Sequence, residues 1–175
     1  IEKVKNIAEK NNSSSLKISK SNDERLKFWA GRKAAFPACG VLAPDYMCMD
    51  GSIPRGKLAE VLNEITRLSK KYNLPVANAF HAGDGNLHPL IMFDANDPEE
   101  LKKCEEFGAD ILKYCVKVGG ALTGEHGVGI EKRELMCEAF NDKDIQQQLT
   151  IKVALDPNSL LNPGKVYPIL RKCAE

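Results

Sequence analysis

The sequence is poor in several kinds of residue and pattern, and each scarcity excludes a class of protein. Its six cysteines form no C-x-x-C pair and no zinc-finger spacing, so neither kind of cysteine motif is expected. Neither sign of charge dominates: 25 basic and 24 acidic residues leave a net charge of +1, which gives no electrostatic reason to expect nucleic acid or anionic lipid as a partner. No apolar run approaches the roughly 18 residues of a membrane span. Histidine is scarce too, and all three histidines lie in two short glycine-rich motifs.

The composition is that of a folded domain. With 175 residues, of which 43% are hydrophobic and 28% charged, the chain is long and apolar enough for a real core. Cys104 and Cys115 are eleven residues apart, which returns them to nearly the same helix face, and we expect them to be small core residues. We expect the six cysteines to be buried reduced thiols, which indicates a cytoplasmic protein, with a peripheral place at the inner face of the membrane as an option.

The order of hydrophobic patterns predicts an α+β fold. A capping box at Ser21 and Glu24 begins one helix, which Pro37 should end. A second helix is predicted to begin at Asp97 and to stop at Gly119. The other predicted helices cover 55–72, 130–140 and 143–155, and the predicted strands cover 16–19, 46–53, 76–81 and 87–93. Adjacent strands in a hairpin argue for an antiparallel sheet with helices on one face, followed by C-terminal helices and an extended tail.

The first histidine motif, HAGDGNLH, spans residues 81–88. If 83–86 is a four-residue hairpin loop, His81 faces His88, and directly opposed Cβ atoms lie about 4.5–5.5 Å apart on one side of the sheet. Two imidazoles so placed can bind one metal ion, with Asp84 orienting a ligand. The alternative is that both histidines serve packing or loop hydrogen bonds.

The second motif, TGEHGVG, spans residues 123–129 and places a carboxylate beside an imidazole. Glu125 would complete a His2Glu metal site and leave His126 free as acid or base. The glycine order matches neither the dinucleotide fingerprint nor a P-loop, which excludes a phosphate cradle. The alternative is a structural turn in which Glu125 caps the next helix.

Arg32 shares a predicted helical stripe with Trp29 and Phe36. A guanidinium on an apolar face needs an anionic partner, because burying it unpaired is costly. Spacing alone leaves open whether that partner is an internal carboxylate or a substrate carboxylate.

Five segments together resemble one family. They are WAGRKAAFPACG (29–40), MDGSIPR (49–55), HAGDGNLHP (81–89), GEHGVG (124–129) and DPNSLLNPGK (156–165). In this order they are similar to the C-terminal part of the FAD-linked 2-hydroxy acid oxidases and dehydrogenases, most of all the glycolate oxidase and D-lactate dehydrogenase branches. The matches span nearly the whole chain.

The resemblance implies a domain organisation. Residues 1–155 would form an N-terminally truncated cap domain with a ferredoxin-like antiparallel sheet, and 156–175 a tail that returns to an absent FAD-binding domain. Ile1 lies inside an amphipathic pattern, which also suggests a piece of a longer polypeptide. In the tail, Asn162 would contact the FAD.

The resemblance also implies roles for the site residues. A divalent metal, often zinc, would lie on His81, His88 and Glu125, while His126 acts near the substrate hydroxyl. Arg32 would bind the substrate carboxylate.

The resemblance further implies the substrate and partners. Relatives that act on longer dicarboxylic acids carry lysine where this chain has Cys48, and Phe36 replaces a hydroxyl residue, which favours glycolate or D-lactate. Electrons would pass to an electron-transferring flavoprotein, an iron–sulfur subunit or a quinone. The chain alone is expected to be inactive and to self-associate through surface meant for the flavin domain.

Two other classes remain open at this stage. A metal-dependent hydrolase could use the same His/His/Glu set with a bound water and would need no flavin. A stand-alone ferredoxin-like module could bind a metal or a small acid without catalysis.

Overall fold

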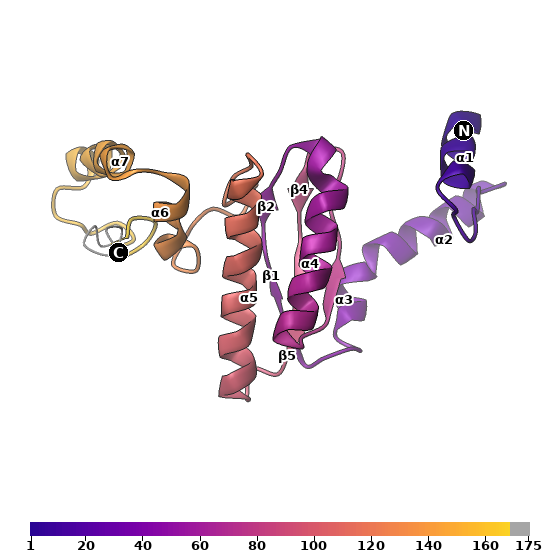
Figure 1. The fold of residues 1–175 in the computed structure, drawn as a ribbon, viewed down its shortest axis with the longest axis horizontal. Helices are drawn as coiled ribbons and strands as arrows, with labels where there is room; N and C mark the ends of the chain where they lie inside the picture. Colours follow the sequence, from indigo (N-terminus) through magenta and orange to yellow (C-terminus); the bar gives the residue numbers. More distant parts are fainter. Residues whose placement is uncertain (169–175) are drawn as a thin grey trace. The chain divides into compact units, whose positions relative to one another are not determined.

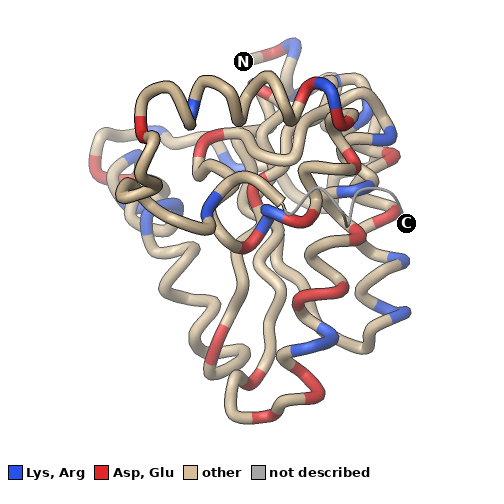
Figure 2. Tube along the Cα trace, turned by 90° about the vertical axis from the view of Figure 1, so that its left-hand side faces the viewer, with Lys and Arg blue, Asp and Glu red and all other residues tan. Residues whose placement is uncertain are grey.

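A computed structural model describes residues 1–168 of the chain. The chain divides into two compact units, Ile1–Ala38 and the part from Cys39 onward, which are described separately. Both signs of charge are spread along the chain (Figure 2), in keeping with the net charge of +1. Among the described residues, none of the helices combines the length and the apolar character that crossing a membrane requires.

The first unit is helical and has little core of its own. It contains α1 (Glu2–Lys10), α2 (Asn22–Lys33) and most of α3 (Ala35–Cys39), and neither α1 nor α2 has a buried residue. The predicted capping interaction is confirmed, because the Ser21 side chain accepts a hydrogen bond from the N–H of Glu24.

Two predictions for this unit are wrong. Residues 16–19 form no strand. Pro37 does not end the helix: α2 already stops at Lys33, and Pro37 lies in the first turn of α3, where its missing N–H leaves no helical hydrogen bond unmade.

The second unit is built on antiparallel strands (Figure 1). One sheet has the order β1-β5-β3, from Asp45–Cys48, Pro89–Phe93 and Val76–Asn78, and β2 (Gly51–Ser52) pairs separately with β4 (Asn86–Leu87). Cys48 lies opposite Leu90 and Gly51 lies opposite Leu87. The β1–β5 and β2–β4 pairings therefore have the same register. On the edge of β2 that faces away from β4, Ser52 forms an antiparallel β-bridge with Ala121.

Helices α4 (Leu58–Tyr72) and α5 (Pro98–Lys117) lie side by side against the sheet (Figure 1). A short 3-10 turn, η1 (Arg55–Lys57), precedes α4. As predicted, Asp97 caps α5, because its carboxylate accepts hydrogen bonds from the N–H groups of Glu99 and Glu100. All five residues of β5 are buried, and Ile91 and Phe93 share a core cluster with residues of α4 and α5. The α+β class with an antiparallel sheet and helices is therefore confirmed.

The chain beyond residue 130 is mostly helical. It forms η2 (Arg133–Leu135), α6 (Met136–Ala139) and α7 (Asp142–Leu155). The predicted helix over 130–140 is thus much shorter, whereas the one over 143–155 is confirmed. From Asp156 to residue 168 the chain has neither helix nor strand, as expected for the tail.

The cysteines mostly follow the prediction. Cys104 and Cys115 are buried on α5, Cys39 is buried, Cys48 is half-buried, and all four are free. Burial raises the pKa of both α5 thiols to about 12. Cys137 is disulfide-bonded, so the expectation of a reduced thiol is wrong there. Cys173 lies outside the described residues.

Candidate functional site

The loop of the histidine hairpin lies one residue earlier than predicted, which shifts the strand pairing by two residues. Asn78 pairs with Pro89, and His81 pairs with Asn86, so the loop comprises 82–85 and the predicted pairing of His81 with His88 is wrong. Residues two apart on a strand project from the same face, so His88 stays on the face that Asn86 shares with His81. The two rings are 5.3 Å apart, edge to face.

Gly85 makes the tight loop possible. Its φ of 79° lies in the left-handed region, and a Cβ there would stand 2.1 Å from the carbonyl oxygen of Ile53. The N–H of Ile53 donates to the Gly85 carbonyl at 2.9 Å. The hairpin tip is therefore tied to the chain that follows β2.

The predicted metal ligands and the predicted acid–base residue meet at one point. Glu125 Oε1 lies 2.8 Å from Nε2 of His88, 3.7 Å from Nε2 of His81 and 4.0 Å from Nε2 of His126. The rings of His88 and His126 are stacked with centroids 5.0 Å apart. Three imidazoles thus surround a single carboxylate oxygen.

The 2.8 Å separation is close to that of two ligands on one cation, and the separations of 3.7 and 4.0 Å are wider. Two ligands bound at about 2.1 Å stand about 3.0 Å apart at right angles and about 3.4 Å apart in a tetrahedron. The possible ligand atoms of Asp50, His88, Glu125 and His126 all lie within 4.8 Å of one another. His126 therefore belongs to this group, although the sequence placed it outside the ligand set, whereas the predicted ligand His81 is not among its members.

The other nitrogen of the His88 ring faces a thiol. Cys48 Sγ lies 3.9 Å from Nδ1 of His88 and 3.6 Å from the carbonyl oxygen of Met49. Burial, reinforced by the charge of Asp50, raises the pKa of the Cys48 thiol to about 11. The thiol can donate to the Met49 carbonyl while its sulfur accepts from Nδ1, a tautomer that leaves the lone pair of Nε2 for a metal.

A buried ion pair that sequence reasoning missed lies next to this cluster. Lys132 Nζ is 3.2 Å from Oδ2 of Asp50, and the two residues are only 2% and 0% exposed. Burial would raise the pKa of Asp50, but hydrogen bonds from Thr123, from the N–H groups of His126 and Glu125, and from Lys132 hold it well below its ordinary value. In the sequence, Asp50 lies within the predicted strand over 46–53, and nothing local connects it to Lys132.

Two polar cavities adjoin the cluster. One of about 430 Å³ is lined by Ser52, His81, Asp84, Asn86, Gly124 and Glu125. Within the described part of the chain, Asn86 Oδ1 is the one buried side-chain oxygen or nitrogen without a hydrogen-bond partner. The other cavity, of about 360 Å³, is lined by residues 126–132 and Lys165. A small polar ligand therefore has room on either side of Glu125 and His126.

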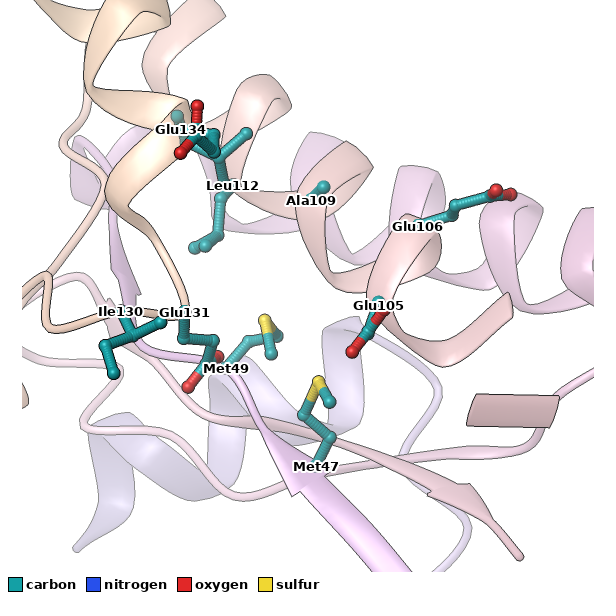
Figure 3. A pocket seen from close by; sticks show the side chains of 10 residues that line it. Met47, Met49, Glu105, Glu106, Ala109, Leu112, Ile130, Glu131 and Glu134 are labelled. Atoms are coloured by element: carbon teal, nitrogen blue, oxygen red, sulfur yellow. The ribbon is translucent and has the colours of Figure 1, made fainter. Parts of the chain in front are cut away.

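A third cavity, of about 460 Å³, has a different character. Met47 and Met49 point into it from the sheet side, and Glu105 and Glu131 lie at its edge (Figure 3). No histidine lines it. It offers an apolar surface bordered by acids and none of the candidate catalytic groups.

Two further predicted site residues are Arg32 and Asn162. Arg32 belongs to α2 in the first unit, where it is exposed, and its neighbour Trp29 is 52% exposed, so the expected buried apolar face is absent from this helix. Asn162 has a left-handed φ of 48°, and its side-chain oxygen accepts from Lys165 Nζ at 3.2 Å. Both are therefore exposed within their own parts of the chain.

Comparison with known proteins supplies relatives for the whole chain. It is 53% identical over 174 residues to glycolate oxidase subunit GlcD of Escherichia coli, covering 99% of this chain and 35% of the relative. It is 33% identical to the mitochondrial D-lactate dehydrogenase [cytochrome] of Arabidopsis thaliana, covering 94% of this chain and 30% of the relative. The chain thus spans about a third of the length of the curated relatives it matches.

A solved structure shows the same fold. The 4-ethylphenol oxidase from Gulosibacter chungangensis aligns with a TM-score of 0.51 and 21% identity over 70% of this chain and 24% of that one. A family model described as FAD linked oxidases, C-terminal domain, matches residues 1–166. The chain therefore belongs to the family of FAD-linked oxidases, of which it is the C-terminal domain.

Proposed function

We propose that this chain is the substrate side of an FAD-dependent oxidoreductase that converts glycolate or D-lactate into the 2-oxo acid. The observation that carries the proposal is the convergence of three imidazoles on Glu125 Oε1, at 2.8–4.0 Å. The relatives named glycolate oxidase subunit and D-lactate dehydrogenase support the substrate class. Cys48 lies beside the cluster at the position where relatives acting on longer dicarboxylic acids carry lysine, which agrees with a substrate that has one carboxylate.

We propose that His81, His88 and Glu125 hold a divalent metal, with zinc expected. Two imidazoles and a carboxylate are a common catalytic zinc set that leaves a position open. A bound cation would favour ionisation of the substrate hydroxyl. The half-exposed Glu125 and His81 leave an approach from solvent, while His88, at 5% side-chain exposure, is fixed in the interior.

His126 is the proposed base. Its ring stacks on His88 at 5.0 Å, and its side chain is 47% exposed, so it can meet a substrate hydroxyl beside the cluster and pass the proton to water. Arg32 is the proposed partner of the substrate carboxylate, because a guanidinium binds carboxylate through two parallel hydrogen bonds. This role requires α2 to lie beside the cluster in the complete enzyme.

The flavin is proposed to bind mainly to a separate N-terminal domain, with residues 1–155 as the cap and 156–175 as the returning tail. When bound, FAD accepts the hydride from the substrate carbon. In the tail, Leu160 and Leu161 are 77% and 63% exposed, which agrees with a segment that lies on another surface and presents Asn162 to the cofactor.

We also propose that the cap is ferredoxin-like. The order β1–β2, α4, β3, β4–β5, α5 is that of a β-α-β-β-α unit, and the bridge from Ser52 to Ala121 adds the start of a final β segment beside β2.

Electrons are proposed to pass from the flavin to an electron-transferring flavoprotein, an iron–sulfur subunit or a quinone. The enzyme is proposed to be cytoplasmic or peripheral to the membrane, and the chain alone to be inactive and prone to self-association.

The test is anaerobic flavin reduction by the full-length enzyme. We expect glycolate or D-lactate to bleach the flavin, and His126→Ala to slow this at least about 100-fold, in line with the contribution of a general base. The variant should retain its FAD. An unchanged rate would remove His126 from the role, and hydrolysis by the chain without flavin would favour a hydrolase.

A further inference from the structure

The buried pair Asp50–Lys132 has no part in the chemistry described so far. Its side chains are 0% and 3% exposed, and Lys132 Nζ donates to both the backbone oxygen (3.1 Å) and Oδ2 (3.2 Å) of Asp50. Desolvating two charges is unfavourable unless hydrogen bonds satisfy the remaining donors and acceptors. The bonds that satisfy Asp50 come from the loop that carries the candidate site.

Three consecutive backbone N–H groups converge on this carboxylate. Gly124 donates at 3.0 Å, Glu125 at 3.1 Å and His126 at 2.8 Å, and the Thr123 hydroxyl donates at 2.6 Å. Successive N–H groups arranged in this way form a concave anion site, here filled by a side chain of the same chain. Asp50 therefore fixes the backbone of 124–126.

The loop has few other constraints. Residues 124–127 belong to no helix or strand, and the side chains of Glu125 and His126 are about half exposed, at 52% and 47%. At its far end, Gly127 donates its N–H to Thr123 Oγ1 at 2.9 Å, an oxygen that also contacts Asp50. Because the backbone sets the direction of each Cα–Cβ bond, Asp50 determines where both functional side chains begin.

Asp50 also lies in register with the histidine hairpin. The N–H of Met49 donates to the carbonyl of Pro89 at 3.0 Å, and Gly51 lies opposite Leu87. Asp50 therefore stands opposite His88 on the neighbouring strand. One buried residue thus connects the loop of Glu125 to the strand of His88.

Asp50 is unsuited to be a metal ligand itself. A carboxylate offers about four lone-pair positions, and this one already accepts from four loop donors and from Lys132. We propose that Asp50, neutralised by Lys132, is the positioning residue that holds Glu125 and His126 against His88. The inference rests on the proposed metal site for its functional meaning, but its structural part can be tested without a metal.

The first test is amide hydrogen exchange by NMR on the metal-free chain. In the wild type, the N–H groups of 124–126 should exchange at least about tenfold more slowly than in an unstructured peptide. The paired variant Asp50→Asn/Lys132→Met leaves no unpaired charge and should lose this protection, while the buried residues Ile91 and Leu112 keep theirs. The control is Lys71→Met/Asp110→Asn, a partly exposed pair joined at 2.8 Å, which should leave the loop unchanged.

The exchange experiment can overturn the proposal in three ways. The proposal fails if the wild-type amides of 124–126 exchange freely. It also fails if these amides stay protected in the paired variant. If the paired variant does not fold, Thr123→Val removes one donor to Asp50 without changing charge. It should speed exchange at 124–127, and unchanged exchange there would contradict the proposal.

The second test separates positioning from folding. Zinc affinity, measured by competition with a chromophoric chelator, should fall at least tenfold in Asp50→Asn/Lys132→Met and stay within twofold in the surface control. Wild-type affinity in a folded paired variant would overturn the role of Asp50. If the wild type binds no zinc, the proposed metal site fails, while the exchange result still decides whether Asp50 positions the loop.

Discussion

Nε2 of the buried His88 lies 2.8 Å from Oε1 of Glu125, whose side chain is half exposed to solvent. The imidazole side chain is 5% exposed and the carboxylate side chain 52%. A buried ring held between strands keeps its place without a ligand, whereas a half-exposed carboxylate can move. His88 is thus the fixed member of the site and Glu125 the adjustable one.

This difference predicts unequal effects of the two hairpin histidines. His88→Ala should lower zinc affinity about 100-fold or more, because it removes the preorganised ligand, while His81→Ala should cost about tenfold. The exposed Glu134→Gln serves as the control and should leave affinity unchanged. Equal losses in the two histidine variants, measured by chelator competition, would contradict this ranking.

Gly124 has no room for a side chain. A Cβ there would stand 2.3 Å from Nδ2 of Asn86 and 2.9 Å from Oδ1 of Asp50. Gly124→Ala should therefore displace the loop and lower the free energy of unfolding by about 1–3 kcal/mol. Gly83, whose Cβ would meet nothing within 4 Å, is the matched control in the neighbouring loop. Urea denaturation of Gly124→Ala and Gly83→Ala checks the pair, and similar midpoints would refute the steric argument.

The Cys48 thiol should be unreactive in the folded chain. Burial and the charge of Asp50 raise its pKa to about 11, so its thiolate fraction at pH 8 is roughly 200-fold below that of an ordinary cysteine. Iodoacetamide labelling at pH 8, followed by mass spectrometry, should be slow at Cys48 until the chain is unfolded. Fast labelling under native conditions would show that the thiol is ionised or open to solvent.

Asp156 should make the stability of the folded chain depend on pH in the acidic range. Its contact with Lys152 and the N–H of Leu161 lower its pKa. Since the folded-state pKa lies below the unfolded value of about 3.9, the stabilisation is complete above that value and is lost as the pH falls through the folded pKa. Thermal unfolding between pH 6 and pH 2.5 should show a shallower loss in Asp156→Asn than in the wild type. Parallel curves would remove Asp156 from this role.

Local signals predicted much of the fold. The Asp97-Pro98 start of α5, the apolar stripe of α4 and the turn between the histidines all act within a few residues, and each is found in the structure. The hairpin register was predicted two residues off, and because an even shift keeps each side chain on the same face of the sheet, the histidines still meet.

The unpredicted features depend on contacts between distant residues. Asp50 and Lys132 are 82 residues apart, and only the fold brings a lone aspartate to three N–H groups of a distant loop. Arg32 was predicted from a helical stripe, but α2 has no buried face, because an apolar stripe is buried only where another element covers it. Periodicity reports which face of a helix is apolar, and tertiary structure decides what covers it.

The central claim is that His81, His88 and Glu125 bind one divalent ion. The most direct measurement is zinc stoichiometry of the purified chain combined with X-ray absorption at the zinc edge. The account predicts one ion per chain, with nitrogen and oxygen ligands that include at least two imidazoles, and loss of the ion in His81→Ala/His88→Ala. Zinc bound through sulfur alone, or bound equally well by that double variant, would contradict it.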